Sequence, residues 1–400
     1  MPDASLIDVH AHFTTDAYIA AAKAAGHVEP DGMPEHYWPR WNAEEHIGLM
    51  ERAGIQKAVL SISSPGVHFG DDKAAAELAR EVNEAAAAIV DAHPGRFGFF
   101  ASLPVPAVAA ALCEVRYALD ELGAAGIILM TNSGGHYLGD DRIASLLAEL
   151  NRRRAVVLLH PTSAEQHEAV DLGRPRPMLE FLFDTARTVI DYILSGNAER
   201  YPAIKLVIPH AGGVLPLLAE RVQLFRSIAG EPPGRTSVSQ LLARYYFDLA
   251  GPPSRPQLDS LTAVASATRL VYGSDYAWTR ADVVLHALDG LDKLLHLEKP
   301  WREVASANAQ ELLSLGSQYE AVRSGAGLAR GTGLFIKESE RSCRPRASKP
   351  SWRDLRAPSR CCATGRTVRT SSRCAASTAT GATSRRPGPP RRWCSTRAIT

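Results

Sequence analysis

Eight short apolar runs alternate with longer amphipathic stretches over the first 316 residues of this 400-residue chain. The runs are Leu6–Phe13, Lys57–Ser63, Phe97–Leu103, Gly126–Asn132, Ala155–Pro161, Lys205–Gly213, Tyr245–Ala250 and Leu270–Asp275. Each contains β-branched or aromatic residues and is mostly continuous in its hydrophobicity, which is typical of strands buried on both faces. Eight such strands separated by helices predict a (β/α)₈ TIM-like barrel over residues 1–316. A doubly wound open sheet is the alternative fold.

The stretches between these runs have the apolar spacing of amphipathic helices. They include Asn42–Ala53, Asp72–His93, Ala107–Leu122, Asp140–Arg153, Met178–Ser195, Arg280–His296 and Trp301–Leu315. We expect Asn42 to cap the first of them, because Glu44 and Glu45 then lie where the helix dipole favours negative charge. The last helix is expected to end at Gly316.

The composition of the chain changes abruptly after this last predicted helix. Residues 1–316 hold 27 Lys and Arg against 39 Asp and Glu, whereas residues 317–400 hold 18 against 4. Because residues 317–400 also lack apolar periodicity, we expect a disordered basic tail. Its origin has three interpretations: an arm that binds nucleic acid or another polyanion, a Cys-rich metal module, or a GC-rich coding sequence read in a shifted frame. We favour the third and assign the tail no function.

The cellular location expected for residues 1–316 is the cytoplasm. Their single cysteine, Cys113, gives no basis for disulfides. The N-terminus lacks the basic and apolar segments of a signal peptide, and no apolar run approaches the ~20 residues that span a bilayer. We therefore expect no membrane partner, and the acidic composition of residues 1–316 argues against nucleic acid.

Five titratable residues lie at the predicted carboxyl ends of strands: His10, His12, His160, His210 and Asp275. Side chains two apart on a strand point to the same side, so both imidazoles of the His-x-His pair can reach one ion. Each residue alone has an ordinary interpretation, such as a hydrogen-bonded buried histidine or a helix-capping aspartate. In a barrel, however, these strand ends converge on one mouth, where active sites are built.

In these motifs, including Pro-His-Ala-Gly-Gly and Gly-Ser-Asp-Tyr, the chain resembles the aminocarboxymuconate-semialdehyde decarboxylase branch of the amidohydrolase superfamily. The segments Ser61–Gly70, His93–Phe97 and Leu119–Gly126 further resemble its 6-methylsalicylate decarboxylase-like members. The resemblance extends from Leu6 to Leu313 and stops where the composition changes.

The resemblance implies a ligand set and an acid/base residue. One divalent metal ion would be bound by His10, His12, His160 and Asp275, with His210 and Asp275 as the catalytic residues. Zinc is the expected ion and manganese the alternative, because three nitrogens and one carboxylate suit either.

The resemblance also implies a homodimer and one residue that contacts substrate, and aromatic residues near the mouth of the barrel are further candidates. Arg221 corresponds to an arginine that reaches a substrate carboxylate across the dimer interface of relatives, with a solvated helix charge as the alternative. Phe13 and Trp278 are expected to contact the substrate ring, with packing at the rim as the alternative. The enzyme that gives the branch its name has a second carboxylate-binding arginine, where this chain offers only Arg40, out of register. We therefore expect an aromatic monocarboxylate as substrate.

The expected function is the metal-dependent, non-oxidative decarboxylation of an ortho-hydroxybenzoate such as 6-methylsalicylate. A metal-dependent hydrolase or hydratase that uses the same site is the alternative, and polyanion binding through the basic tail is a remote one. His68 and His136 fall in the loops after the second and fourth strands, on the same face of the barrel.

Overall fold

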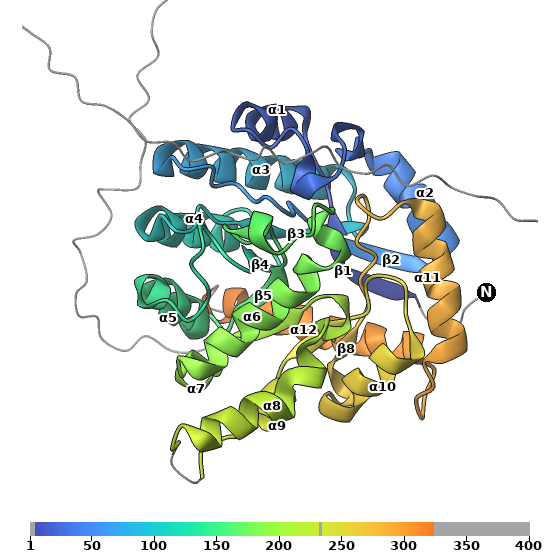
Figure 1. Cartoon of the computed structure of the whole chain (residues 1–400). Helices are drawn as coiled ribbons and strands as arrows, with labels where there is room; N and C mark the ends of the chain where they lie inside the picture. The colour runs from blue at the N-terminus through green and yellow to red at the C-terminus, as the bar shows by residue number, and fades with distance from the viewer. Residues whose placement is uncertain (1–4, 232–233, 324–400) are drawn as a thin grey trace, which may run out of the picture. The chain divides into compact units, whose positions relative to one another are not determined.

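The computed structural model of the chain describes residues 5–231 and 234–323, within which eight parallel strands form one sheet in sequence order (Figure 1). The strands are β1 (Leu6–His12), β2 (Ile55–Ser61), β3 (Phe97–Ser102), β4 (Gly126–Met130), β5 (Val156–His160), β6 (Lys205–Ile208), β7 (Tyr246–Asp248) and β8 (Leu270–Val271). Asp8 also forms a parallel bridge with Tyr272, which follows β8. The ring therefore closes, and the predicted (β/α)₈ barrel is confirmed.

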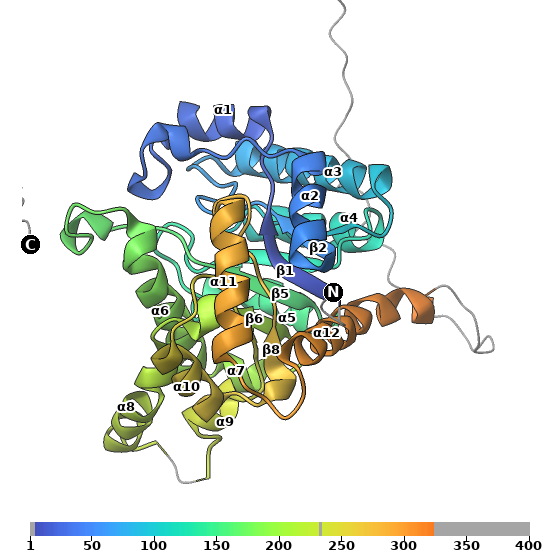
Figure 2. The same cartoon turned by 90° about the vertical axis from the view of Figure 1, so that its right-hand side faces the viewer.

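The helices lie around this ring of strands (Figures 1 and 2). They are α1 (Asp16–Ala24), α2 (Ala43–Ala53), α3 (Asp72–Ala92), α4 (Val108–Asp120), α5 (Ala144–Arg152), α6 (Glu180–Leu194), α7 (Asn197–Arg200), α8 (Leu215–Ile228), α9 (Val238–Leu242), α10 (Arg255–Val264), α11 (Ala281–Leu294) and α12 (Trp301–Arg323). The Asn42 side chain accepts a hydrogen bond from the Glu45 amide, so α2 begins as predicted. β6 ends earlier than its apolar run, because Pro209 has no N–H group to continue the ladder.

The last helix differs from the prediction. α12 does not end at Gly316 but continues to Arg323. A glycine inside a helix costs only about 1 kcal/mol relative to alanine, so the change in composition does not mark the end of the helix. The disordered tail predicted for residues 317–400 lies outside the described residues from position 324 onward.

The two faces of the strands contribute to two separate apolar layers. The inner layer contains Ile7, Val9, Val59, Phe100, Ile128, Val156, Leu158, Val207, Tyr246 and Val271, together with Ala309 and Leu312 of α12. α12 lies at the amino ends of the strands, where the Ser306 hydroxyl donates to the Ser5 carbonyl and the Asn308 amide donates to the Leu270 carbonyl. Because α12 closes this end of the barrel, the site must lie at the carboxyl ends.

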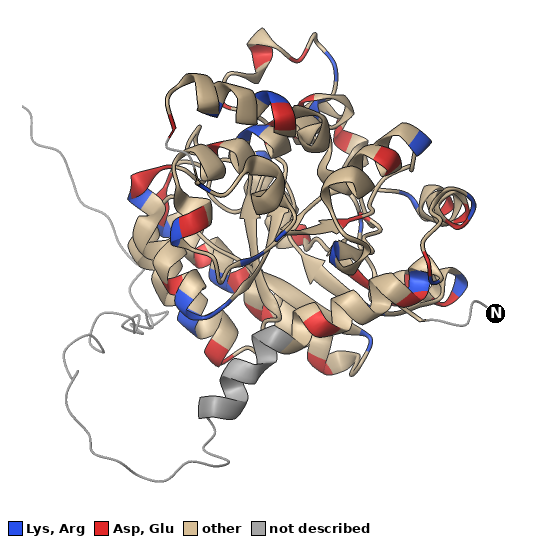
Figure 3. Cartoon of the chain, turned by 90° about the horizontal axis from the view of Figure 1, so that it is seen from below, with Lys and Arg blue, Asp and Glu red and all other residues tan. Residues whose placement is uncertain are grey.

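The outer layer packs between the strands and the surrounding helices. In α3, for example, the buried residues Ala75, Leu78, Ala79 and Val82 recur at helical spacing and face the barrel. Charged residues lie mostly on the outer helices (Figure 3). Among the described residues, no helix combines the length and hydrophobicity that crossing a membrane requires.

A buried histidine in this outer layer gives the first testable prediction. His46 on α2 is 1% exposed, and its Nδ1 accepts a hydrogen bond from the Trp41 indole. Burial is the main cause that lowers the pKa of His46 to about 3. The unfolded chain, with a histidine pKa of about 6.5, therefore binds a proton that the folded chain rejects, and stability falls as the pH drops below that value.

Between pH 7 and pH 5, His46 should cost the folded state about 2 kcal/mol. His46→Asn keeps an acceptor for Trp41 and removes the titration, so its free energy of unfolding should fall less over this interval than that of the wild type. Urea unfolding at the two pH values measures the difference, with the exposed His36→Asn as control. Equal losses in wild type and His46→Asn would contradict the prediction.

Candidate metal centre

The first two site residues reach the barrel interior because β1 contains an irregularity. Asp8 pairs with Ala58 and Ala11 pairs with Leu60, so β1 advances three residues where β2 advances two. Such a β-bulge resets the alternation of side chains. Val9 packs in the inner layer, yet His10 and His12 also point inward, and both are fully buried.

Four donor groups from three strand ends meet at this rim. The side chains of His10, His12, His160 and Asp275 each offer one ligand atom, and these atoms all lie within 4.8 Å of one another. The Nε2 atoms of His10 and His12 are 3.0 Å apart, and Asp275 Oδ1 lies 3.2 Å from His12 Nε2. The strand ends predicted to converge do so, and three imidazoles with one carboxylate form a donor set for a divalent transition metal.

The other ring nitrogen of each histidine has a partner that fixes the orientation of the ring. His10 Nδ1 lies 2.8 Å from Asp248 Oδ2, His12 Nδ1 lies 3.1 Å from the Ser61 hydroxyl, and His160 Nδ1 lies 2.7 Å from the Pro161 carbonyl. With Nδ1 donating, Nε2 carries the lone pair that a metal ion needs. The three histidines therefore fit a metal ion in tautomer as well as in position.

The electrostatics of the site favour a cation. Burial lowers the pKa of His12 and holds the pKa of His160 well below its usual range, so both imidazoles are in the neutral, metal-binding form. Burial opposes the charged form of His10 too, but the carboxylate of Asp248 outweighs it and raises the pKa of His10 to about 9. Burial also opposes ionisation of Asp275, yet hydrogen bonds to His12 and His210 hold its pKa well below the usual value.

His210 is placed beside this group by a left-handed backbone. Its φ is 55°, and Asp275 has φ 57°, a region that residues other than glycine rarely adopt. The His210 amide donates to Asp248 Oδ1 and its carbonyl accepts from the Gln257 side chain, so the backbone is held on both sides. His210 Nε2 lies 3.6 Å from Asp275 Oδ2, and among the described residues its Nδ1 has no hydrogen-bond partner.

A cavity of about 410 Å³ opens directly over these groups. His160, His210 and Asp275 form its polar base. The walls are more apolar and include Met33, Met178, Phe181, Leu182, Pro252 and Trp278. The indole N–H of Trp278 is buried without a partner in the described part of the chain, which leaves it available to a ligand.

Of the other residues predicted to contact substrate, only one lines this cavity. Trp278 lines the cavity as expected, but Phe13 does not: it is 2% exposed, belongs to the outer layer and packs against Trp41. The reason is the strand alternation, since Phe13 follows the inward-facing His12 and must point toward the helices. Arg221 is exposed on α8, over the Phe225 ring, and Arg40 is likewise exposed outside this cavity.

Asp248 is a site residue that the sequence analysis missed. Its two carboxylate oxygens join the ligand His10 to the backbone of His210, and it also accepts from the Ala250 amide. The signal was present, because Asp248 is a carboxylate inside an otherwise apolar strand run. A charge in such a position requires a buried partner.

A closed barrel with a His₃Asp donor set at its carboxyl rim defines a metal-dependent barrel enzyme. The comparisons with known proteins make this specific: residues 7–315 match the family model described as Amidohydrolase, and the chain belongs to that family. A 6-methylsalicylic acid decarboxylase of Aspergillus aculeatus is 38% identical over 290 residues, covering 70% of this chain and 86% of the relative.

Solved structures agree with the fold. A protein described as amidohydrolase II superposes with a TM-score of 0.72 at 32% identity, covering 78% of this chain and all of that one. A dihydroxybenzoic acid decarboxylase of Polaromonas superposes with a TM-score of 0.69 at 22% identity, covering 78% of this chain and 97% of that one. That structure contains manganese and the inhibitor 2-nitroresorcinol. The predicted family resemblance is confirmed.

Proposed function

We propose that this protein is a metal-dependent, non-oxidative decarboxylase of ortho-hydroxybenzoates, with 6-methylsalicylate as the leading candidate substrate. The observation that carries the proposal is the convergence of His10, His12, His160 and Asp275 beneath an apolar cavity. Relatives named as 6-methylsalicylic acid, gamma-resorcylate and dihydroxybenzoic acid decarboxylases support it. A hydrolase or hydratase stays the alternative reaction, and the cytoplasmic location stays a prediction.

The four clustered side chains are proposed as the ligands of one divalent ion. Zinc, expected from the donor set, and manganese, found in the Polaromonas enzyme, are the two candidates. When bound, the ion supplies the positive charge that holds the carboxylate or ortho-phenolate of the substrate in a fixed orientation.

The chemical difficulty is the carbanion that direct loss of CO₂ from an aromatic ring would leave. A proton placed first on the carboxyl-bearing ring carbon avoids it. The C–C bond then breaks, its electron pair restores the aromatic ring, and CO₂ leaves. His210 is proposed to deliver that proton, because it borders the cavity and its Nε2 lies 3.6 Å from the Asp275 carboxylate.

The cavity walls are proposed to select and orient the ring. Phe181 and Leu182 provide apolar contact, and the buried indole N–H of Trp278 can donate to an oxygen of the substrate. The described residues that line this cavity include no Lys or Arg. One chain alone is therefore suited to a monocarboxylate whose charge is met by the metal ion.

Counting products distinguishes the two reactions. Decarboxylation of 6-methylsalicylate releases CO₂ and 3-methylphenol in equal amounts, whereas hydrolysis of a lactone or amide releases no CO₂. We expect equimolar CO₂ and phenol from ortho-hydroxybenzoates and none from benzoate, which lacks the ortho hydroxyl. Lactone hydrolysis without CO₂ release would reject the proposal.

A homodimer is proposed from one face of α8. Leu217, Leu224 and Ile228 lie on the same face as Arg221, at helical spacing, and each is more than half exposed. An exposed apolar row is typical of an interface. Such a dimer would place Arg221 at the interface, where the resemblance implies that it reaches the cavity of the partner subunit.

Light scattering of the wild type should give twice the mass of one chain. Leu224→Glu should have the mass of one chain and a raised KM for the substrate. Val283→Glu, a partly exposed apolar residue on α11, serves as the matched control and should stay dimeric. A wild type with the mass of one chain would contradict the dimer without affecting the reaction proposed.

Asp248→Asn should weaken metal binding by about 10–100-fold. The asparagine oxygen can still accept from the His210 amide, but its NH₂ group faces His10 Nδ1. The proton of neutral His10 must then move to Nε2, which removes the lone pair required by the ion. Metal affinity measured by competition with a chelator tests this. Asp184→Asn, which alters another fully buried carboxylate, should leave that affinity unchanged, and an unchanged affinity in Asp248→Asn would refute the role.

A further inference from the structure

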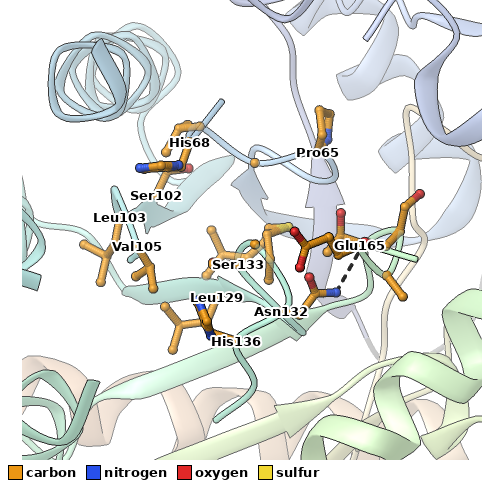
Figure 4. Close-up of a pocket in the computed structure, with 18 of the residues that line it drawn as sticks. Pro65, His68, Ser102, Leu103, Val105, Leu129, Asn132, Ser133, His136 and Glu165 are labelled. Atoms are coloured by element: carbon orange, nitrogen blue, oxygen red, sulfur yellow. Dashed lines mark hydrogen bonds between the residues drawn. The ribbon is translucent and has the colours of Figure 1, made fainter. Parts of the chain in front are cut away.

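A second cavity of about 420 Å³ opens beside the first at the same rim of the barrel. Its lining comes largely from the loops after β2, β3, β4 and β5 and includes His68 and His136, the two loop histidines that the sequence places on the same face of the barrel as the metal ligands. Figure 4 shows Leu103, Val105 and Leu129 on one side of this cavity, and Asn132 and Glu165 on another.

The wall between the two cavities is thin, because neighbouring residues of the same segment line opposite sides of it. Ser64 borders the first cavity and Pro65 the second. Arg176 borders the second and Pro177 the first. Asp31, only 8% exposed, borders both.

Hydrogen bonds between side chains also cross this wall. The Ser163 hydroxyl donates to Asp31 Oδ1 and accepts from Arg176 Nε at 2.9 Å. The hydroxyls of Ser64 and Thr162 lie 2.7 Å apart. Rotation of these side chains would open a path between the cavities without a change of fold.

The chemistry of the second lining differs from that of the metal centre. Its base is apolar and consists of Leu103, Leu129, Leu138, Ile143 and Leu146, all at most 6% exposed. Its charged residues are the carboxylates Glu29, Asp31 and Glu165 against one guanidinium, Arg176. This lining can cover an aromatic ring, but its excess of negative charge repels an aromatic carboxylate.

We propose that the second cavity binds the neutral phenol produced by decarboxylation, an inference that rests on the proposed function. The substrate is an anion held by the metal ion. When CO₂ leaves, the product loses that charge, and a phenol with a pKa of about 10 is neutral at pH 7. The product is therefore released from the cationic site and accepted by the acidic one, where Glu165 can accept its hydroxyl hydrogen bond.

Binding of 3-fluorophenol to the metal-loaded protein, followed by ¹⁹F NMR, tests this without turnover. Saturating benzoate fills the metal site and is not decarboxylated. We expect about one 3-fluorophenol to stay bound per chain in the presence of benzoate. Displacement of all bound 3-fluorophenol by benzoate in the wild type would overturn the proposal, whereas absence of CO₂ release from any hydroxybenzoate would overturn only the proposed function.

Filling the cavity provides the second arm of the experiment. Ser133 lines the second cavity and uses only its backbone to pair with His136, so a larger side chain leaves that pairing intact. Ser133→Trp should weaken the retained 3-fluorophenol binding at least tenfold, and Ser133→Ala should change it less than twofold. Equal binding by the two variants would contradict the proposed location.

The third arm of the experiment reverses one charge of the lining, so its result does not depend on how tightly side chains pack in the cavity. Glu165→Arg balances the lining charges and should admit benzoate, so that excess benzoate now displaces the retained 3-fluorophenol. Glu168→Arg makes the same charge change on the same loop, outside the lining, and should retain it. Identical behaviour of these two variants would show that the lining charge does not select the ligand.

Discussion

Removal of the divalent ion should abolish CO₂ release, and adding back zinc or manganese should restore it. In the proposed mechanism, the ion bound by the His₃Asp group supplies the charge that holds the aromatic carboxylate beside His210. We expect about one ion per chain by elemental analysis, and the metal that restores activity identifies the ion that the site uses.

The control is the fold of the metal-free protein. The side chains of the three histidine ligands are held by Asp248, Ser61 and the Pro161 carbonyl as well as by the barrel, so circular dichroism should change little on metal removal. Full activity in protein shown to be metal-free would reject the mechanism. Loss of activity together with the secondary structure would mean that the ion is required for folding.

His210→Asn should lower kcat by roughly 10²–10⁴-fold while the metal content stays near one per chain. The ligand atoms nearest the metal position belong to other residues, whereas His210 borders the cavity where the ring carbon must be protonated. If kcat falls while the metal content does not, His210 is assigned to proton transfer rather than to metal binding.

His296→Asn, at an exposed histidine after α11, is the matched control and should keep the wild-type rate. An unchanged kcat in His210→Asn would remove His210 from its proposed role. A fall in metal content that parallels the fall in rate would place His210 among the ligands.

The positions of strand ends could be predicted from the sequence, and with them the meeting of His10, His160 and Asp275 at one rim. Apolar runs ending in a titratable residue are a local pattern, and the closure of a barrel brings such ends together. The bulge between Asp8 and Ala11 could not be predicted in this way, because an extra residue in one strand depends on its pairing with the next.

The contacts of individual side chains were predicted less well. Phe13 was expected at the substrate as an aromatic residue near the mouth of the barrel, but the alternation of the strand turns it toward the helices. Asp248 was overlooked because its importance comes from two partners distant in sequence, His10 and His210. The second cavity has no motif at all, since loops after four different strands each contribute part of it.

The position of α12 has a consequence for how the chain is made. The helix that closes the amino ends of the strands is the last of the described elements to leave the ribosome, although it contacts β1, the first of them. Until α12 has been synthesised, Val9, Val59 and Phe100 lack the helix that covers them at the amino ends of the strands. Chains cut short before Trp301, by a stop codon or a protease, would expose an apolar ring and should be recognised by chaperones instead of accumulating as enzyme.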